Sequence, residues 1–231
     1  MNTMLTHLEI NEENRNQDWD EKFFKLFSES SLQILADDPQ QGPDGWPYLI
    51  CDIILEKTSD TRPQNDKIDS AQKILHWLST RGIGLVVNPK KLPYPDYVFS
   101  YGMIWSFRET GYFIKYQNLD VDKKSDKKPD KKFVINQNSN LKVGPPSPEY
   151  FPQYVRSIIK DFLRDQSVFD ARILMISTDG KNYDLCFSLE SLGSPPEVEH
   201  EGILEAISWF LPPHYSVAVV SEKGLQGFES L

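Results

Sequence analysis

The chain has 231 residues, enough for one large domain or two small ones, and its 39% hydrophobic content is sufficient to bury a core. A formal net charge of −9 argues against nucleic acid as a partner, because phosphate binding requires a basic surface. No apolar run approaches the roughly eighteen residues of a membrane span, and the N-terminus lacks the basic and apolar regions of a signal peptide. We therefore expect a cytoplasmic protein that binds neither nucleic acid nor membranes.

The negative charge is concentrated in the first third of the chain. Residues 1–70 hold fifteen Asp and Glu against six Lys and Arg, whereas residues 71–231 hold nineteen of each kind. Such an acidic segment would attract a basic partner protein, although acidic residues also serve solubility alone. The two cysteines, Cys51 and Cys186, lie far apart in apolar runs, so we predict buried free thiols and no disulfide or metal site.

The N-terminal half begins with a polar stretch, 1–17, that we expect to be flexible. From Trp19 onward the apolar residues follow helical spacing, which predicts a helix over 19–36 with Asp18 as its N-cap. The next elements are predicted from their apolar patterns and from the Gly and Pro residues that bound them. They are a strand at 48–56, a helix at 66–81 and a short strand at 83–89 that ends at Asn88-Pro89.

Eight aromatic side chains lie between residues 82 and 113. From Tyr97 to Arg108, large side chains alternate with small or polar ones, a period of two that predicts a strand with one heavy face. Gly102 in its middle indicates either a bulge or a close approach of another backbone segment. Residues 112–116 are predicted to return as an antiparallel strand.

We interpret the aromatic strand mainly as core, covered by the two predicted helices. The alternative is a partly exposed aromatic platform, because the polar tips of Tyr and Trp suit a binding surface. On that alternative the candidate binding residues are Tyr97, Tyr101, Trp105, Arg108 and Glu109.

Residues 119–140 repeat a D-K-K unit three times and contain few apolar residues, so we expect a flexible loop or linker; a basic docking segment is the alternative. The remaining residues, 141–231, show the order helix, strand, strand, helix, strand, with Asp179-Gly180 at a hairpin turn. The sequence thus predicts an α+β protein of two small modules, 18–118 and 141–231. Each is expected to be a mainly antiparallel or mixed sheet covered by helices.

The segment LKVGPPSPEYFPQYVRSIIKDFLRDQSVFDARILMIS, residues 141–177, resembles the start of the C-terminal domain of the SseB family, the enhanced serine sensitivity proteins. The similar positions are Gly144, Pro145, Val168, Ala171 and Ile173. The later ILEAISWFLPPHYSVAVVS resembles the family's last helix and strand, and GLVVNP resembles a strand end of its N-terminal domain. The aromatic segment and the D-K-K segment depart from the family. The resemblance implies a fold and a poorly defined role, and it supplies no catalytic residues.

Motifs for catalysis are absent from the sequence. There is no GxSxG element and no phosphate-binding glycine loop, and none of the four histidines lies beside a nucleophile motif. The acidic run EVEHEG fits the first turn of a helix better than a metal site, since neighbours in sequence rarely converge on one ion. We therefore predict no catalytic residue, metal or cofactor.

The leading hypothesis is a non-enzymatic cytoplasmic interaction protein, SseB-like, whose acidic and aromatic N-terminal module docks a protein partner. One alternative is an enzyme with a site between the two modules, for which Glu109, Arg108, His76 and Asp96 are the first candidates. Another is an acidic immunity or secretion-accessory protein that blocks a basic partner.

Overall fold

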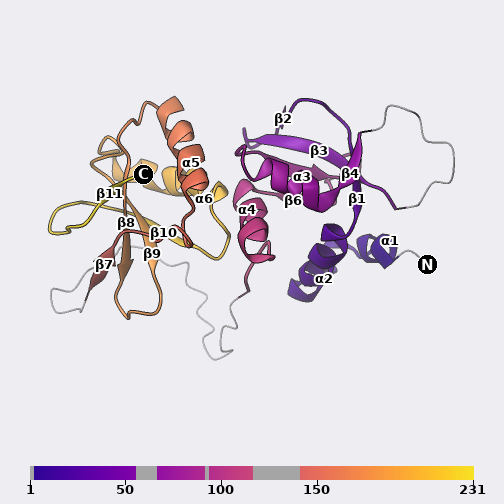
Figure 1. Ribbon diagram of the computed structural model, residues 1–231, viewed down its shortest axis with the longest axis horizontal. Coiled ribbons are helices and arrows are strands. Elements are labelled where there is room, and N and C mark those ends of the chain that lie inside the picture. The colour runs from indigo at the N-terminus through magenta and orange to yellow at the C-terminus, as the bar shows by residue number, and fades with distance from the viewer. Residues whose placement is uncertain (1–2, 56–66, 92–93, 117–140) are drawn as a thin grey trace. The chain divides into compact units, whose positions relative to one another are not determined.

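The computed structural model combines helices with two mixed β-sheets and is therefore α+β, as predicted (Figure 1). The ranges that it describes are 3–55, 67–91, 94–116 and 141–231. The D-K-K segment at 119–140 lies outside them. None of the helices in these ranges is long and apolar enough to cross a membrane.

The chain divides into two compact units. The first comprises Met1–Ile114 together with Ala206–Pro213, and the second comprises Lys115–Glu205 together with His214–Leu231. The expected modules were 18–118 and 141–231. In the structure, residues 206–213 and the residues before 18 belong to the first unit, and the division between the units falls after Ile114.

The first unit is built on a mixed sheet in which the strands follow the order β4-β1-β3-β5-β6, with β2 paired to β3. Only the β3–β5 pair is parallel among the strand pairs of this sheet that the structure describes. Its elements in chain order are α1 (Thr3–Leu8), the 3-10 turn η1 (Glu12–Asn14), α2 (Gln17–Ser28), β1 (Ser31–Ile34), β2 (Gln40–Gln41), β3 (Pro47–Ile53), β4 (Ile68–Ser70), α3 (Ala71–Leu78), β5 (Gly84–Val87), β6 (Tyr97–Phe99) and α4 (Tyr101–Thr110).

Helix α2 supplies the aromatic side of the core. The side chain of Asn16 caps the helix by accepting a hydrogen bond from the backbone N–H of Trp19 at 3.0 Å. Phe23 and Phe27 follow on one face and are fully buried against Phe99, with ring centroids 6.2 and 4.7 Å away. The helix is shorter than predicted, because Leu32 pairs with Ile53 in the sheet and this pairing overrides the helical spacing.

The N-terminal stretch, which we expected to be flexible, carries the helix α1. Met4, His7 and Leu8 of α1 are buried. The ring of His7 stacks on Trp19 with centroids 4.8 Å apart. The indole N–H of Trp19 donates to the carbonyl of His7 at 3.0 Å, and Nε2 of His7 lies 2.8 Å from the carbonyl oxygen of Trp19. These contacts hold α1 against α2.

The predicted aromatic strand is correct only for its first three residues, since α4 begins at Tyr101. The hydroxyl of Ser100 accepts from the N–H of Met103 at 3.4 Å, and Gly111 ends the helix with a φ of 76°. Every residue from Tyr101 to Ser106 is buried, so this part of the helix has no exposed polar face and its sequence shows no helical period. Residues 112–116 form no strand; Phe113 instead stacks on Phe107 at 4.4 Å.

Residues 206–213 close the other side of α4. The indole N–H of Trp105 donates to the carbonyl of Phe210 at 2.8 Å. A Cβ placed on Gly102 would lie 1.9 Å from the carbonyl oxygen of Leu211. Of the two explanations offered for Gly102, the close backbone approach is therefore confirmed and the bulge is wrong.

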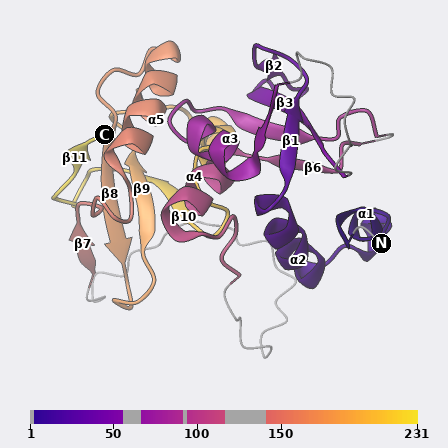
Figure 2. The ribbon, with the colours of Figure 1, turned by 45° about the vertical axis from the view of Figure 1, so that its right-hand side comes forward.

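The second unit contains a mixed sheet with the strand order β10-β9-β8-β11, and β7 pairs with β8. Figure 2 shows β8 and β9 side by side, joined by the predicted hairpin at Asp179-Gly180. The predicted order of helices and strands is present, with β7 and β11 added at its ends. The elements after residue 140 are β7 (Lys142–Gly144), α5 (Gln153–Asp165), β8 (Arg172–Ser177), β9 (Asp184–Ser188), the 3-10 turn η2 (Glu197–Glu199), α6 (His200–Trp209), β10 (Ser216–Val220) and β11 (Glu229–Ser230). The residues of α6 from Ala206 onward belong to the first unit.

The close approach at Gly102 gives a testable prediction for stability. We expect Gly102→Ala to lower the free energy of unfolding by roughly 1–3 kcal/mol, because the added methyl group would force the backbone at Leu211 to move. The matched control is Gly202→Ala, also inside a helix, where nothing lies within 4 Å of the new Cβ and the exchange should be neutral or stabilising. Urea unfolding of both variants measures the difference, and equal stabilities would contradict the packing described for α4.

Candidate functional site

The aromatic candidates Tyr101 and Trp105 are core residues and cannot form a binding platform. Both are fully buried, and each has its polar atom satisfied inside the first unit. The hydroxyl of Tyr101 donates to the carbonyl of Ser79 at 2.7 Å, and the indole of Trp105 donates to Phe210. The core interpretation of these two side chains is therefore correct.

The other candidate residues occupy two separate places. Tyr97 is partly buried and packs its ring on Phe23 at 4.9 Å. Arg108, on the last turns of α4, donates to the hydroxyl of Ser79 at 3.0 Å and forms an ion pair with its exposed neighbour Glu109 at 3.5 Å. Tyr97 therefore packs in the core, and the hydrogen bond from Arg108 links α4 to the end of α3.

Of the enzyme candidates, Asp96 belongs to a cluster of its own. His76 is exposed on α3, whereas the Asp96 side chain is buried, 6% exposed, and forms ion pairs with Arg15 and Lys91. Its second carboxylate oxygen accepts a hydrogen bond from the amide of Asn88 at 2.8 Å. The carboxylate thus already has three donors inside the protein.

Asn88, the first residue after the strand β5, links two parts of the first unit through its side chain. Its φ of 52° lies in the left-handed region, which Asn tolerates better than most residues. In that conformation its side-chain oxygen accepts from the N–H of Ile53 at 2.8 Å, while its amide group holds Asp96. One side chain therefore ties the end of β3 to the loop that leads into β6.

Arg15 and Lys91 extend the cluster to the N-terminal segment. Arg15 donates to the carbonyl groups of Asp96, Ile10 and Leu8 at 2.9, 3.2 and 3.3 Å, and its guanidinium lies 4.3 Å from the centroid of the Trp19 ring. Lys91 also donates to the carbonyl of Leu8, at 3.2 Å. The positive charges are thus used to hold residues 8–15 in place.

Two neighbouring hollows open on this cluster in the first unit. The larger, of about 620 Å³, is lined by apolar side chains of the N-terminal segment and by Leu55. The smaller, of about 370 Å³, runs along β6 past Trp19, Tyr94 and Val98. Both are lined by Glu12, Arg15 and Asp96.

The lining of the two hollows, called here the acidic face, combines negative charge with exposed apolar groups. Five carboxylates line it against the two cations Arg15 and Lys91. The carboxylates are those of Glu9, Glu12, Glu13, Asp20 and Asp96. Tyr94 and Val98 are 63% and 41% exposed. Composition located four of these five carboxylates in the first third of the chain, but it did not predict which residues lie together.

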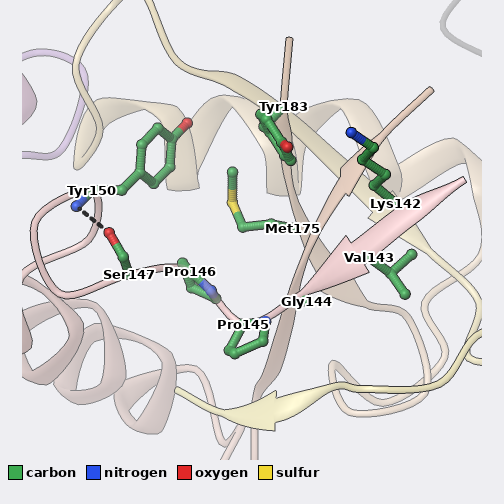
Figure 3. Close-up of a pocket in the computed structure, with 9 residues that line it drawn as sticks. All are labelled: Lys142, Val143, Gly144, Pro145, Pro146, Ser147, Tyr150, Met175 and Tyr183. Atoms are coloured by element: carbon green, nitrogen blue, oxygen red, sulfur yellow. Dashed lines mark hydrogen bonds between the residues drawn. The ribbon is translucent and has the colours of Figure 1, made fainter. Parts of the chain in front are cut away.

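A further hollow, of about 360 Å³, lies in the second unit (Figure 3). Met175 lies between the rings of Tyr150 and Tyr183, and Lys142 is the one charged side chain of the lining. The ring of Tyr150 stacks on Tyr215 at 4.3 Å, and burial raises the pKa of its hydroxyl, with a smaller contribution from Asp184. This lining offers an apolar contact and no acid–base pair.

The two cysteines lack the character of nucleophiles. Cys51 and Cys186 are buried free thiols, as predicted. Burial raises the pKa of each to about 12, with smaller contributions from Asp52 and Asp184 respectively. Among the residues that the structure describes, no group of His, Cys, Asp and Glu is arranged to hold a metal ion.

Comparison of the chain with protein-family models, with curated proteins and with solved structures found no match.

The buried carboxylate gives a prediction for the N-terminal segment. We expect Asp96→Asn to lower the free energy of unfolding by roughly 3 kcal/mol, the lower end for breaking a buried ion pair because Lys91 is partly exposed. Backbone amides of residues 8–15 should also exchange faster with deuterium, since Arg15 loses the carboxylate. Asp38→Asn, at an exposed position, is the control. Unchanged exchange at residues 8–15 would show that Asp96 does not anchor this segment.

The thiols give a second prediction, this one for reactivity. At about pH 8 both should stay protonated and react with a disulfide reagent only slowly in the native protein, because a pKa near 12 leaves almost no thiolate. In denaturant both should react at once. A thiol that reacts quickly in the folded protein would contradict its burial.

Proposed function

We propose that the protein is a non-enzymatic cytoplasmic protein that binds a basic partner protein through the acidic face of its first unit. The observation that carries the proposal is the lining that the two hollows share, which places exposed apolar side chains beside a net negative charge. Protein interfaces commonly combine an apolar centre with a charged rim. Complementary charge in that rim speeds association and selects the partner.

The internal use of Arg15 and Lys91 supports the same proposal. Both cations are bound to Asp96 and to backbone carbonyls, so they already have internal partners for much of their positive charge. Glu9, Glu12 and Glu13 remain exposed at the rim. The surface is also well anchored, because the same bonds fix the segment that carries these glutamates, and a fixed surface loses less conformational entropy on binding.

We also propose, from the sequence resemblance of residues 141–231, that the second unit is SseB-like. The order of α5, β8, β9, α6 and β10 in the second half of the chain is compatible with that resemblance. The family's poorly defined role fits a protein that acts by binding rather than by catalysis.

Charge reversal on the acidic face tests the proposal in the full-length protein. We expect Glu12→Lys combined with Glu13→Lys to weaken capture of a cross-linked and identified cellular partner by about tenfold or more, because complementary charge is replaced by repulsion. Capture by the unaltered protein should also weaken as salt is added, since exposed charges are screened beyond about 8 Å at physiological ionic strength.

The matched control reverses two exposed carboxylates outside the acidic face, Glu29→Lys with Asp38→Lys, and should capture the partner normally. The full chain is needed, because Ala206–Pro213 completes the first unit and a chain ending at residue 118 would lack it. Equal loss in both double variants, or capture that does not respond to salt, would refute a role for the acidic face.

A further inference from the structure

The hollow of the second unit reaches the sheet at a glycine of the strand β7. In the antiparallel pair of β7 and β8, Gly144 lies opposite Met175, and Lys142 lies opposite Ser177. Residues directly opposite each other in such a pair share one face of the sheet. Gly144 has no side chain to place beside Met175, and a Cβ built on it would meet no atom within 4 Å. The hollow of about 360 Å³ therefore extends to the backbone of β7.

The lining of this hollow is largely apolar and aromatic. Met175 lies between the rings of Tyr150 and Tyr183 (Figure 3), and Pro145 and Pro146 also line the space. Aromatic rings make favourable stacked and edge-to-face contacts with one another, and the sulfur of methionine makes favourable contacts with aromatic rings. The volume is at the lower end of the range for small-molecule pockets. A flat aromatic group of one or two rings therefore suits the hollow in size and in chemistry.

Lys142 adds a positive charge to the lining, and no carboxylate neutralises it. Within the ranges that the structure describes, its ammonium group forms no ion pair and no hydrogen bond. The group lies beside the turn between β8 and β9, because a Cβ on Gly180 would fall 2.6 Å from Nζ of Lys142. The carboxylate of Asp179 in that turn accepts instead from the N–H groups of Lys181 and Asn182, at 2.7 and 2.8 Å. Lys142 is therefore available to an anionic group of a ligand.

Two phenol hydroxyls supply further hydrogen-bond donors. Those of Tyr150 and Tyr183 have no hydrogen-bond partner among the described residues. Burial raises the pKa of the Tyr150 hydroxyl, with a smaller contribution from Asp184, so this hydroxyl stays protonated and can donate. Pro145 and Pro146 have no backbone N–H, which makes their loop a poor cradle for a phosphate group. One ammonium group and two phenols match a singly charged carboxylate better.

We propose that this hollow binds a small aromatic carboxylate, with its ring against Met175 and its carboxylate on the ammonium group of Lys142. The site lies in the second unit, so the proposal goes beyond the proposed function and does not depend on the acidic face. A ligand of about a dozen non-hydrogen atoms should bind here with a dissociation constant on the order of 1 mM or below.

Naphthoate is the probe for the test, and naphthamide is its neutral analogue of nearly the same shape. We expect naphthoate to bind the full-length protein and to shift the NMR signal of the Met175 methyl group, because its ring lies against that side chain. Naphthamide should bind roughly threefold to fivefold more weakly. This is the upper part of the range for losing an ion pair with an exposed side chain such as Lys142.

Three variants locate the site. Lys142→Met removes the charge but keeps much of the side-chain length, so it should weaken naphthoate binding to the level of naphthamide and leave naphthamide binding unchanged. The matched control is Lys223→Met, at an exposed lysine of the second unit outside the lining, which should bind both compounds normally. Gly144→Val should abolish binding of both compounds, because its side chain would occupy the hollow at a strand position that accommodates valine.

Several outcomes would overturn the proposal. Equal binding of naphthoate and naphthamide, or equal losses in Lys142→Met and Lys223→Met, would show that Lys142 does not hold a carboxylate. A Met175 methyl signal that neither compound shifts, or full binding by the Gly144→Val protein, would show that the ring does not occupy the hollow. Reversal of charge at Glu12 and Glu13 should leave naphthoate binding unchanged, which separates failure of this site from failure of the proposed function.

Discussion

The buried carboxylate of Asp96 is the constraint on which the N-terminal half of the first unit depends. A buried charge is strongly unfavourable unless opposite charges and hydrogen-bond donors surround it. The chain satisfies Asp96 with Asn88 and Lys91, which precede it closely in the sequence, and with Arg15, which lies 81 residues away. Satisfying this one anion therefore fixes the N-terminal segment, the end of β5 and the start of β6 together. The proposed binding surface is the outer side of that same arrangement.

Much of the architecture follows from local patterns in the sequence, and the errors have physical reasons. The central strand β3, the body of helix α3 and the hairpin at Asp179-Gly180 were predicted because periodicity and turn residues agree there. The predicted start of that helix at residue 66 is wrong, because Ile68–Ser70 pair with β1 as the strand β4. The segment from Tyr101 to Ser106 misled because a helix buried on all sides leaves no polar face to reveal its period. The large side chains of this segment alternate with small ones by coincidence, which imitates the pattern of a strand. The helix N-cap, Ser100, is a weaker sequence signal than this alternation of six large residues.

The candidate site was less accessible to sequence analysis than the fold. The composition showed that the first third is acidic. The sequence also indicated Asn88-Pro89 as the end of a strand and Asp96 as a candidate residue, but it did not connect the two. Asn88 and Asp96 come together with Arg15 only when β3, β5 and α1 are assembled. The spacing of residues in the sequence does not predict that assembly. Tyr101 and Trp105 were candidate binding residues because they are large and aromatic, but size alone does not distinguish a core residue from a binding residue. Their buried hydrogen bonds to Ser79 and Phe210 decide the matter.

The contribution of Ala206–Pro213 to the first unit has a consequence for synthesis on the ribosome. Trp105 bonds to Phe210, and Tyr48 bonds to Trp209, across 105 and 161 residues of chain. Contacts of such separation close large loops and form late in folding. Translation proceeds from the N-terminus, so the sheet and its aromatic core emerge long before the residues that cover α4. Until residues 206–213 have been made, the nascent first unit exposes the apolar side of that helix, which is the kind of surface that chaperones bind.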